Sequence, residues 1–266
     1  MRHGLRTALC CALSVLTVAA ATVHEYDSCL PLILDGDGWK TTITLVNLDS
    51  APSNFQLSFL GETGFRELWP VTITAPGAAI IGQSVTGVLD AGASLQIETS
   101  GASQSLIRGY AHLAILSGSP LGGSAVLTRT VDGKVQTSTA IPLSPESEQK
   151  SRLQWTASDT EVTELVMVSD TMSATVDLAF RDMQGKVLAR DTITFGEKSL
   201  QVIPVSRFPE LANGRGTVEW SVSFPGADIY EDLTFSAVAL KRNTSGLVTA
   251  LPPMTLPKEQ SRKSQH

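Results

Sequence analysis

Apolar and polar side chains alternate over short runs of this chain, and this period of two constrains the fold more than any other feature. From Val218 to Phe224 every second residue is valine, tryptophan or phenylalanine, and glutamate or serine stands between them. The same alternation occurs over 55–59 and 94–98. Because successive side chains of a strand point to opposite faces, each run predicts a strand with one buried and one solvent-facing side.

Turn sequences separate the alternating runs. They contain glycine after a polar residue, at 61–64, 132–133, 184–185 and 244–246. Several short strands spaced by such turns predict an all-β fold, an antiparallel β-sandwich. The run 165–168 is apolar at every position, so we expect that strand to be covered on both faces. The only helical signal is a turn at 208–212, which Asn213-Gly214 ends.

The pattern repeats after roughly 110 residues, as expected for a duplicated chain. Arg108-Gly109 is echoed by Arg215-Gly216, the sequence at 124–126 by that at 236–238, and the run 55–59 by 176–180. We therefore predict two tandem immunoglobulin-like antiparallel β-sandwich domains, at 29–144 and 152–254. The charged, serine-containing segment 145–151 is the predicted linker.

The N-terminal segment has the layout of a secretory signal peptide. A short basic stretch over 1–6 precedes an apolar run that ends in three alanines at 19–21. This run is shorter than the roughly 20 apolar residues of a membrane span, so we predict a signal peptide at 1–21 and a secreted or periplasmic protein without a membrane span. The polar tail at 255–266 is predicted to be disordered.

Cysteine usage and charge narrow the function classes. Cys10 and Cys11 lie in the predicted signal peptide, so Cys29 is the single cysteine of the mature chain. We expect a buried thiol there, rather than a lipid attachment site; a crosslink between two chains stays open. The formal net charge of −6 argues against nucleic acid as a partner, because phosphate binding needs a basic surface.

The stretch at 32–47 carries a resemblance to a known type of module. It reads Leu-Ile-Leu-Asp-Gly-Asp-Gly-Trp-Lys-Thr-Thr-Ile-Thr-Leu-Val-Asn, and Ile141-Pro142 closes the half. This resembles a poorly characterised bacterial secreted β-sandwich module with an Asp-Gly-x-Gly-Trp turn. The resemblance covers the second half more loosely, since Asp159 stands there without the glycines. It implies a fold and an exported location, and no activity.

Asp35 and Asp37, in the sequence Asp-Gly-Asp-Gly, are candidate calcium ligands. A calcium loop also needs further oxygen ligands and a distal acidic residue, which the following Trp39-Lys40 does not supply. A turn in which aspartates hydrogen-bond to nearby amides and glycines adopt positive φ explains the sequence better. Zinc is disfavoured because one cysteine and scattered histidines do not make a four-ligand set, so we predict no metal site and no cofactor.

Two aromatic residues are candidate binding positions. Trp69 and Trp220 fall in phase with apolar neighbours and are expected in the cores. Trp39 at the turn and Tyr110 in the run 107–116 are expected to be exposed, with Arg108 and His112 beside Tyr110 on the same outer face. Exposed rings can stack on sugars, so Asp35, Asp37, Trp39 and Tyr110 form the predicted binding set.

No catalytic residues are predicted. Nucleophilic catalysis needs a base beside the nucleophile, and His112 is expected on an exposed face. The sequence therefore favours a non-catalytic binding, adhesion or surface-structural protein with a protein or polysaccharide partner at the cell surface or outside the cell. The alternatives are a carbohydrate-binding protein, a periplasmic pilus-type chaperone that lends a strand to its client, and an enzyme with a pocket of convergent titratable groups.

Overall fold

The computed structural model describes residues 28–68, 72–144, 150–170, 172–225 and 235–254. Within these ranges the chain is all β apart from two short 3-10 turns, η1 (Val205–Arg207) and η2 (Pro209–Leu211). All strand pairs are antiparallel, in three sheets, which confirms the predicted fold class at this level. The predicted signal peptide, Trp69, residues 145–149 of the predicted linker and the predicted tail lie outside the described residues.

The first half of the chain forms two sheets that pack face to face. One has the order β1-β9-β3-β7-β6, with β4 beside β3, and the other has the order β11-β10-β2-β8-β5. The bounds are β1 (Ser28–Asp35), β2 (Trp39–Val46), β3 (Ser53–Gly61), β4 (Gly64–Leu68), β5 (Ile73–Thr74), β6 (Ala79–Ile81), β7 (Ser84–Leu89), β8 (Ser94–Thr99), β9 (Ile107–Ser117), β10 (Gly122–Val131) and β11 (Lys134–Pro142). Side chains such as Ile43, Leu57 and Leu113 fill the space between the sheets.

The second half forms one sheet that folds over on itself. Its order is β15-β14-β17-β12-β13-β18-β19, with β16 beside β13. The bounds are β12 (Lys150–Ala157), β13 (Glu161–Ser169), β14 (Ala174–Asp182), β15 (Val187–Phe195), β16 (Ser199–Pro204), β17 (Gly214–Ser223), β18 (Phe235–Asn243) and β19 (Val248–Leu251). Strands β12 and β13 share a single residue pair, Ala157 with Val162, so the two layers separate beyond their turn and enclose a core that contains Trp155 and Trp220.

The two halves repeat one strand order. The run β1-β9-β3-β7 corresponds to β12-β17-β14-β15, and β11-β10-β2-β8 corresponds to β19-β18-β13-β16. Gly109 and Gly216, which the repeat pairs in sequence, lie in the equivalent strands β9 and β17. Each half thus places the same strands at the same positions of its two layers.

The Asp-Gly-Asp-Gly segment forms a tight hairpin between β1 and β2. Gly36 and Trp39 exchange both backbone hydrogen bonds, at 3.0 and 2.9 Å, around Asp37 and Gly38. These two residues have φ of 49° and 80°, which is the signature of a type I′ turn. A Cβ on Gly38 would lie 2.3 Å from the carbonyl oxygen of Thr130, so the close approach of β10 adds a second reason for glycine. The turn interpretation of this segment is confirmed.

Strands β1 and β13 are buried on both faces. For β13 this confirms the prediction from the apolar run, since Leu165 and Met167 face the core of the second half while Val166 and Val168 face the first half. In β1 the register shifts by one residue between Leu30 and Ile33. This bulge contains a proline, which has no N–H to contribute to the ladder.

Because of that bulge, β1 sends side chains into two cores. Leu30 and Ile33 face the interior of the first half, and Leu32 and Leu34 point toward the second half. A third apolar group, here called the interdomain cluster, joins the halves. It consists of Cys29, Leu32, Leu34, Trp39, Leu60, Tyr110, Leu127, Ile141, Val166, Val168, Leu200, Val238, Leu240 and Val248.

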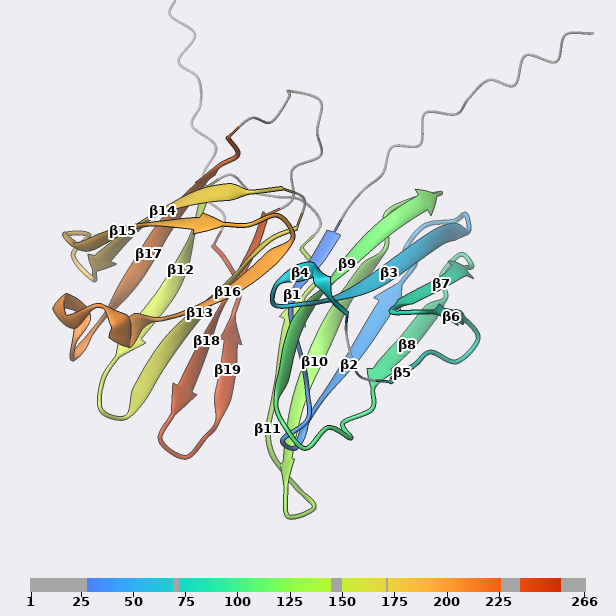
Figure 1. The fold of residues 1–266 in the computed structure, drawn as a ribbon, viewed down its shortest axis with the longest axis horizontal. Coiled ribbons are helices and arrows are strands. Elements are labelled where there is room, and N and C mark those ends of the chain that lie inside the picture. The colour runs from blue at the N-terminus through green and yellow to red at the C-terminus, as the bar shows by residue number, and fades with distance from the viewer. Residues whose placement is uncertain (1–27, 69–71, 145–149, 171, 226–234, 255–266) are drawn as a thin grey trace, which may run out of the picture.

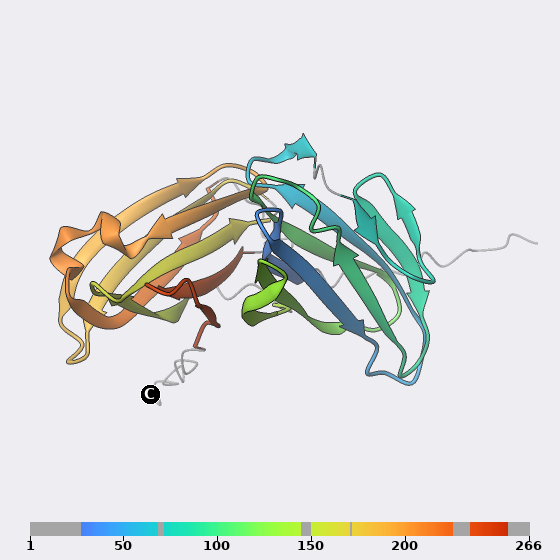
Figure 2. The ribbon, with the colours of Figure 1, turned by 90° about the horizontal axis from the view of Figure 1, so that it is seen from below.

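The two halves lie side by side, with β1 and β11 of the first next to β18 and β19 of the second (Figure 1). The view from below shows the same neighbours in an elongated molecule (Figure 2). Polar contacts reinforce this junction. The Val248 amide donates to Thr137 Oγ1 at 3.0 Å, the Thr137 hydroxyl donates to the Val248 carbonyl at 3.2 Å, and the Ala250 amide donates to Thr139 Oγ1 at 2.8 Å. Threonine side chains of β11 thereby satisfy backbone groups of β19.

Candidate functional site: a crevice between the two halves

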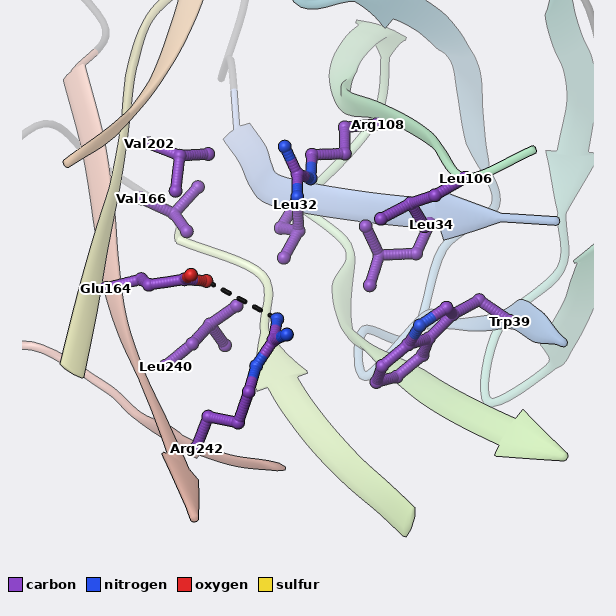
Figure 3. A pocket seen from close by; sticks show the side chains of 10 residues that line it. All are labelled: Leu32, Leu34, Trp39, Leu106, Arg108, Glu164, Val166, Val202, Leu240 and Arg242. Carbon is purple, nitrogen blue, oxygen red and sulfur yellow. Dashed lines mark ion pairs between the residues drawn. The ribbon is translucent and has the colours of Figure 1, made fainter. Parts of the chain in front are cut away.

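A crevice opens where the interdomain cluster reaches the surface (Figure 3). It holds about 20 Å³ of free space. Seven apolar side chains from both halves and three charged ones line it: Leu32, Leu34, Trp39, Leu106, Val166, Val202 and Leu240, with Arg108, Glu164 and Arg242. A volume of this size accommodates one methyl-sized or water-sized group.

Strand register explains how the first half supplies its wall. The β1 bulge turns Leu32 and Leu34 away from their own core, and Leu34 pairs with Arg108 of β9 across the strands. Trp39 is the first residue of β2, directly after the glycine turn, and only 5% of its surface is exposed. The bulge therefore places Leu32 and Leu34, and the turn places Trp39, in the wall that the first half contributes to the crevice.

The second half supplies the opposite wall from alternate positions of neighbouring strands. Glu164 and Val166 lie on the outer face of β13, where Val166 pairs with Val202 of β16 and Glu164 pairs with Leu240 of β18. Arg242 follows two residues later on the same face of β18. The side chains that point inward from β13 fill the core of the second half, so the outer face is free to meet the first half.

The charged groups at the crevice are loosely paired. Arg242 Nη2 lies 3.6 Å from Glu164 Oε2, and Arg108 Nη1 lies 3.8 Å from Glu62 Oε1. Both distances are longer than a hydrogen bond. The Arg108 and Arg242 side chains are 38% and 49% exposed, and exposed ion pairs of this kind contribute little to stability. Their guanidinium N–H groups remain available to a further acceptor.

A buried polar group lies elsewhere in the same interface. Asp170 is fully buried, and its Oδ2 forms a short hydrogen bond with Nδ1 of His112 from the other half. The hydroxyl of Tyr110 is also buried. Burial, and then the charge of Asp170, raises the pKa of both the Cys29 thiol and the Tyr110 phenol. Both groups therefore stay protonated, and Cys29 lacks the thiolate that nucleophilic chemistry requires.

The expected exposure of Trp39 and Tyr110 is wrong. Trp39 is 5% exposed and Tyr110 is 0% exposed, because both pack against side chains of the second half in the interdomain cluster. The expected exposure of His112 is also wrong, since its side chain is 15% exposed and bonds to Asp170 of the second half. Arg108, from the same face, is at the rim and remains partly exposed.

The two candidate calcium ligands engage different partners. Asp35 is buried, and its Oδ1 accepts a hydrogen bond of 2.6 Å from the amide of Gly101. Asp37 is exposed and pairs with Arg129 Nη2 at 2.9 Å. In the part of the chain that the structure describes, no three His, Cys, Asp or Glu side chains come together to hold a metal ion.

Sequence reasoning missed Glu164, Arg242 and Asp170. Each lies far along the chain from the residues that it meets, and nothing in its local sequence distinguishes it from an ordinary polar position on a strand. A local signal of this interface is the run 165–168 of β13, which is apolar at every position and therefore predicts that a second surface packs on the outer face of that strand.

Two wider and shallower hollows lie near the β12–β13 turn. One, of about 210 Å³, is formed by the turn and the 3-10 segment near Phe208. The other, of about 220 Å³, is lined by residues 159–162 and 242–244 together with Glu164. Glu164 and Arg242 belong both to this hollow and to the crevice, so the two spaces are neighbours on the surface.

Comparison with known proteins gave no match to a family model, a curated protein sequence or a solved structure. Among the described segments there is no apolar helix of the length that crossing a lipid bilayer requires.

Proposed function

We propose that the protein is an exported, non-catalytic binding, adhesion or surface-structural protein whose two duplicated immunoglobulin-like modules act as one rigid unit. The observation that carries this proposal is that two potentially reactive side chains are part of the contact between the halves. The Cys29 thiol is buried and protonated at the junction, and His112 is bonded to the buried Asp170 of the other half. Both side chains therefore contribute to the junction between the two modules rather than to an open site.

The immunoglobulin-like assignment is supported by the central strands. In chain order β2, β3, β8 and β9 take the places of strands B, C, E and F, and β2 pairs with β8 and β3 with β9, as B pairs with E and C with F in that fold. The flanking strands differ, since β1 pairs with β9 and β10 pairs with β2. The proposal is therefore an immunoglobulin-like centre with its own edge arrangement.

The rigid junction fits a display or adhesion role better than a hinge. Fourteen buried residues from both halves make up the interdomain cluster, and backbone groups of β19 are bonded to β11. Domains that share such an apolar interface do not move freely against each other. The outward loops and sheet edges are then held at fixed positions relative to a partner.

Export and binding test the proposal together. The full chain is produced in a bacterial host and fractionated, and the mass of the exported form is measured. We expect loss of about 21 residues, as the signal-peptide layout predicts, and retention of the Leu16→Arg variant inside the cell. The purified mature protein should sediment with washed bacterial envelopes. A protein that stays uncleaved in the cytoplasm, and does not bind envelopes, contradicts the proposal.

A periplasmic pilus-type chaperone is the second candidate, because a crevice with two arginines lies at the domain junction. The repeated strand order of the halves speaks against it, since lending a strand to a client calls for dissimilar domains. A chaperone would be recovered in a one-to-one complex with an unassembled subunit, and an adhesion module would remain on the envelope. The carbohydrate alternative is disfavoured, because Trp39 and Tyr110, the two rings predicted to stack on sugars, are buried.

A further inference from the structure

We propose that the outer face of the β12-β17-β14-β15 layer binds a linear acidic polysaccharide, whose carboxylates pair with Arg190, Arg181 and Arg215. This rests on the proposed function, because an exported binding or adhesion protein needs a ligand outside the cell. It names the chemical class of that ligand and the face that holds it.

This outer face, here called the arginine face, points away from the first half. The buried residues that the second half contributes to the interdomain cluster come from β13, β16, β18 and β19. In Figure 1, β12 and β17 lie on the side of the second half that is remote from β11. Trp155, Val218 and Phe180 fill the core, so the side chains that alternate with them on these strands face outward.

Positive charge exceeds negative charge on the arginine face. Two carboxylates stand at its outward positions, Asp177 and Glu219. Five cationic side chains stand there as well: Lys150, Arg152, Arg181, Arg190 and Arg215. Five against two leaves three positive charges in excess, on a chain whose formal net charge is −6. The excess favours an anionic ligand at this face.

Glu219 does not compete for the remaining arginines. Its Oε2 accepts a hydrogen bond of 2.7 Å from Arg152 Nη2, and its Oε1 lies 3.3 Å from Lys150 Nζ. Its distance to Arg181 Nε is 3.9 Å, which is longer than a hydrogen bond. Two neighbouring cations therefore already compensate this carboxylate, and Arg181 is only loosely held.

Three arginines form a diagonal line across three neighbouring strands. Arg190 of β15 is opposite Ala179 of β14, and Arg181 follows two residues later on the same face. Arg181 is opposite Thr217 of β17, and Arg215 precedes Thr217 by two residues. Diagonal neighbours of this kind are about 7–8 Å apart. Arg190 and Arg215 are exposed, and no carboxylate of the described chain is in ion-pair contact with either. One linear polyanion can thus meet all three guanidinium groups.

The uncharged side chains of the face match a sugar polymer. Beside the arginines its outward positions carry hydroxyl and amide groups, such as Gln154, Thr217 and Ser221. The exposed large apolar side chains of the described second half are Met183, Leu247 and Met254, and all three lie outside the strands of this layer. A protein interface has an apolar or aromatic core, and insertion into a lipid surface needs an apolar face. Recognition by charge and hydroxyl groups also needs no exposed aromatic ring.

The test uses the purified mature protein and polygalacturonate, a linear polymer with one carboxylate on each sugar. We expect saturable binding with a Kd of about 0.1 mM or tighter, measured by titration calorimetry. The fully methyl-esterified polymer has the same backbone without the charges and should bind about tenfold more weakly or less, because the charge-assisted pairs are lost. Raising the salt concentration from about 0.05 M to about 0.5 M should weaken binding of polygalacturonate, since contacts between exposed charges are screened.

Two matched double variants localise the effect. Arg190→Gln/Arg215→Gln should weaken binding of polygalacturonate about tenfold, because two charge-assisted pairs are lost. Lys40→Gln/Lys134→Gln removes the same two charges from the first half and should leave binding nearly unchanged. Equal weakening by both variants would mean that net charge alone attracts the polymer, and it would overturn the assignment to this face.

Further outcomes separate this inference from the proposed function. Equal binding of polygalacturonate and its methyl ester, or no binding of either, overturns the inference. So does equally tight binding of polyglutamate or of phosphatidylglycerol vesicles, because the face then selects charge without selecting a sugar polymer. Envelope binding that persists unchanged in Arg190→Gln/Arg215→Gln, without binding of polygalacturonate, removes the polysaccharide site and leaves the proposed function standing. A chain that is neither exported nor bound to envelopes contradicts the proposed function, whatever the polymer does.

Discussion

The pair between His112 and Asp170 gives the sharpest test of how the two halves are held together. Asp170 is fully buried, its Oδ2 is bonded to His112, and its Oδ1 has no hydrogen-bond partner in the described structure. Removing the imidazole in His112→Leu leaves Oδ2 of this buried carboxyl group without its hydrogen-bond partner. Breaking a buried pair in this way costs about 3–5 kcal/mol.

The cost should disappear when both partners are replaced. In His112→Leu/Asp170→Leu neither member of the pair is left without the other, and apolar replacement of a buried pair is often neutral or stabilising. We therefore expect the double variant to regain most of the stability, so that the two single losses are far from additive. Urea unfolding of the wild type, both single variants and the double variant measures this cycle.

Thiol labelling shows whether the loss of stability opens the junction between the halves. Cys29 is buried at the same junction, and it is the only cysteine outside the predicted signal peptide. If the pair holds the modules together, Cys29 should react with a thiol reagent faster in His112→Leu than in the wild type, before global unfolding. A stability loss below about 1 kcal/mol, in the range of an exposed pair, or additive losses in the cycle, would refute the reasoning.

Three further perturbations probe the turn, the junction and the charge network. Gly38→Ala should lower the free energy of unfolding by about 1–3 kcal/mol, because its φ is 80° and the new Cβ would lie 2.3 Å from a carbonyl oxygen; Gly82→Ala, with positive φ but open space, is the control that should lose less. Leu32→Ala should cost about 2–5 kcal/mol by leaving a cavity in the interdomain cluster, with far-UV circular dichroism unchanged in the native state; a loss under 1 kcal/mol would mean that the junction does not depend on this packing. Hydrogen bonds from Arg152 lower the pKa of Glu219, so this carboxylate stabilises the fold above the ordinary carboxyl pKa and the stabilisation is lost as pH falls through the lowered value. Glu219→Gln should therefore flatten the decline of stability at acid pH, and a pH profile identical to that of the wild type would contradict the assignment.

The local sequence determined the strands and their turns. The alternation over 218–224 reappears in β17, where Val218 and Trp220 are buried and Glu219 is not. Asp37 and Gly38 predicted a turn, because few residues adopt positive φ without strain. The apolar run 165–168 predicted a strand covered on both faces. Each of these follows from a periodicity or a backbone preference that a few neighbouring residues express.

Only the tertiary structure decided what covers each face. The outer face of β9 carries Arg108, Tyr110 and His112, which alternation alone assigns to solvent, yet the second half buries Tyr110 and partly covers His112. His112 and Asp170 are 58 residues apart, and no local pattern links them. Side-chain alternation follows from the backbone geometry of a single strand, whereas burial of an outer face depends on a partner surface that folding brings in from elsewhere in the chain.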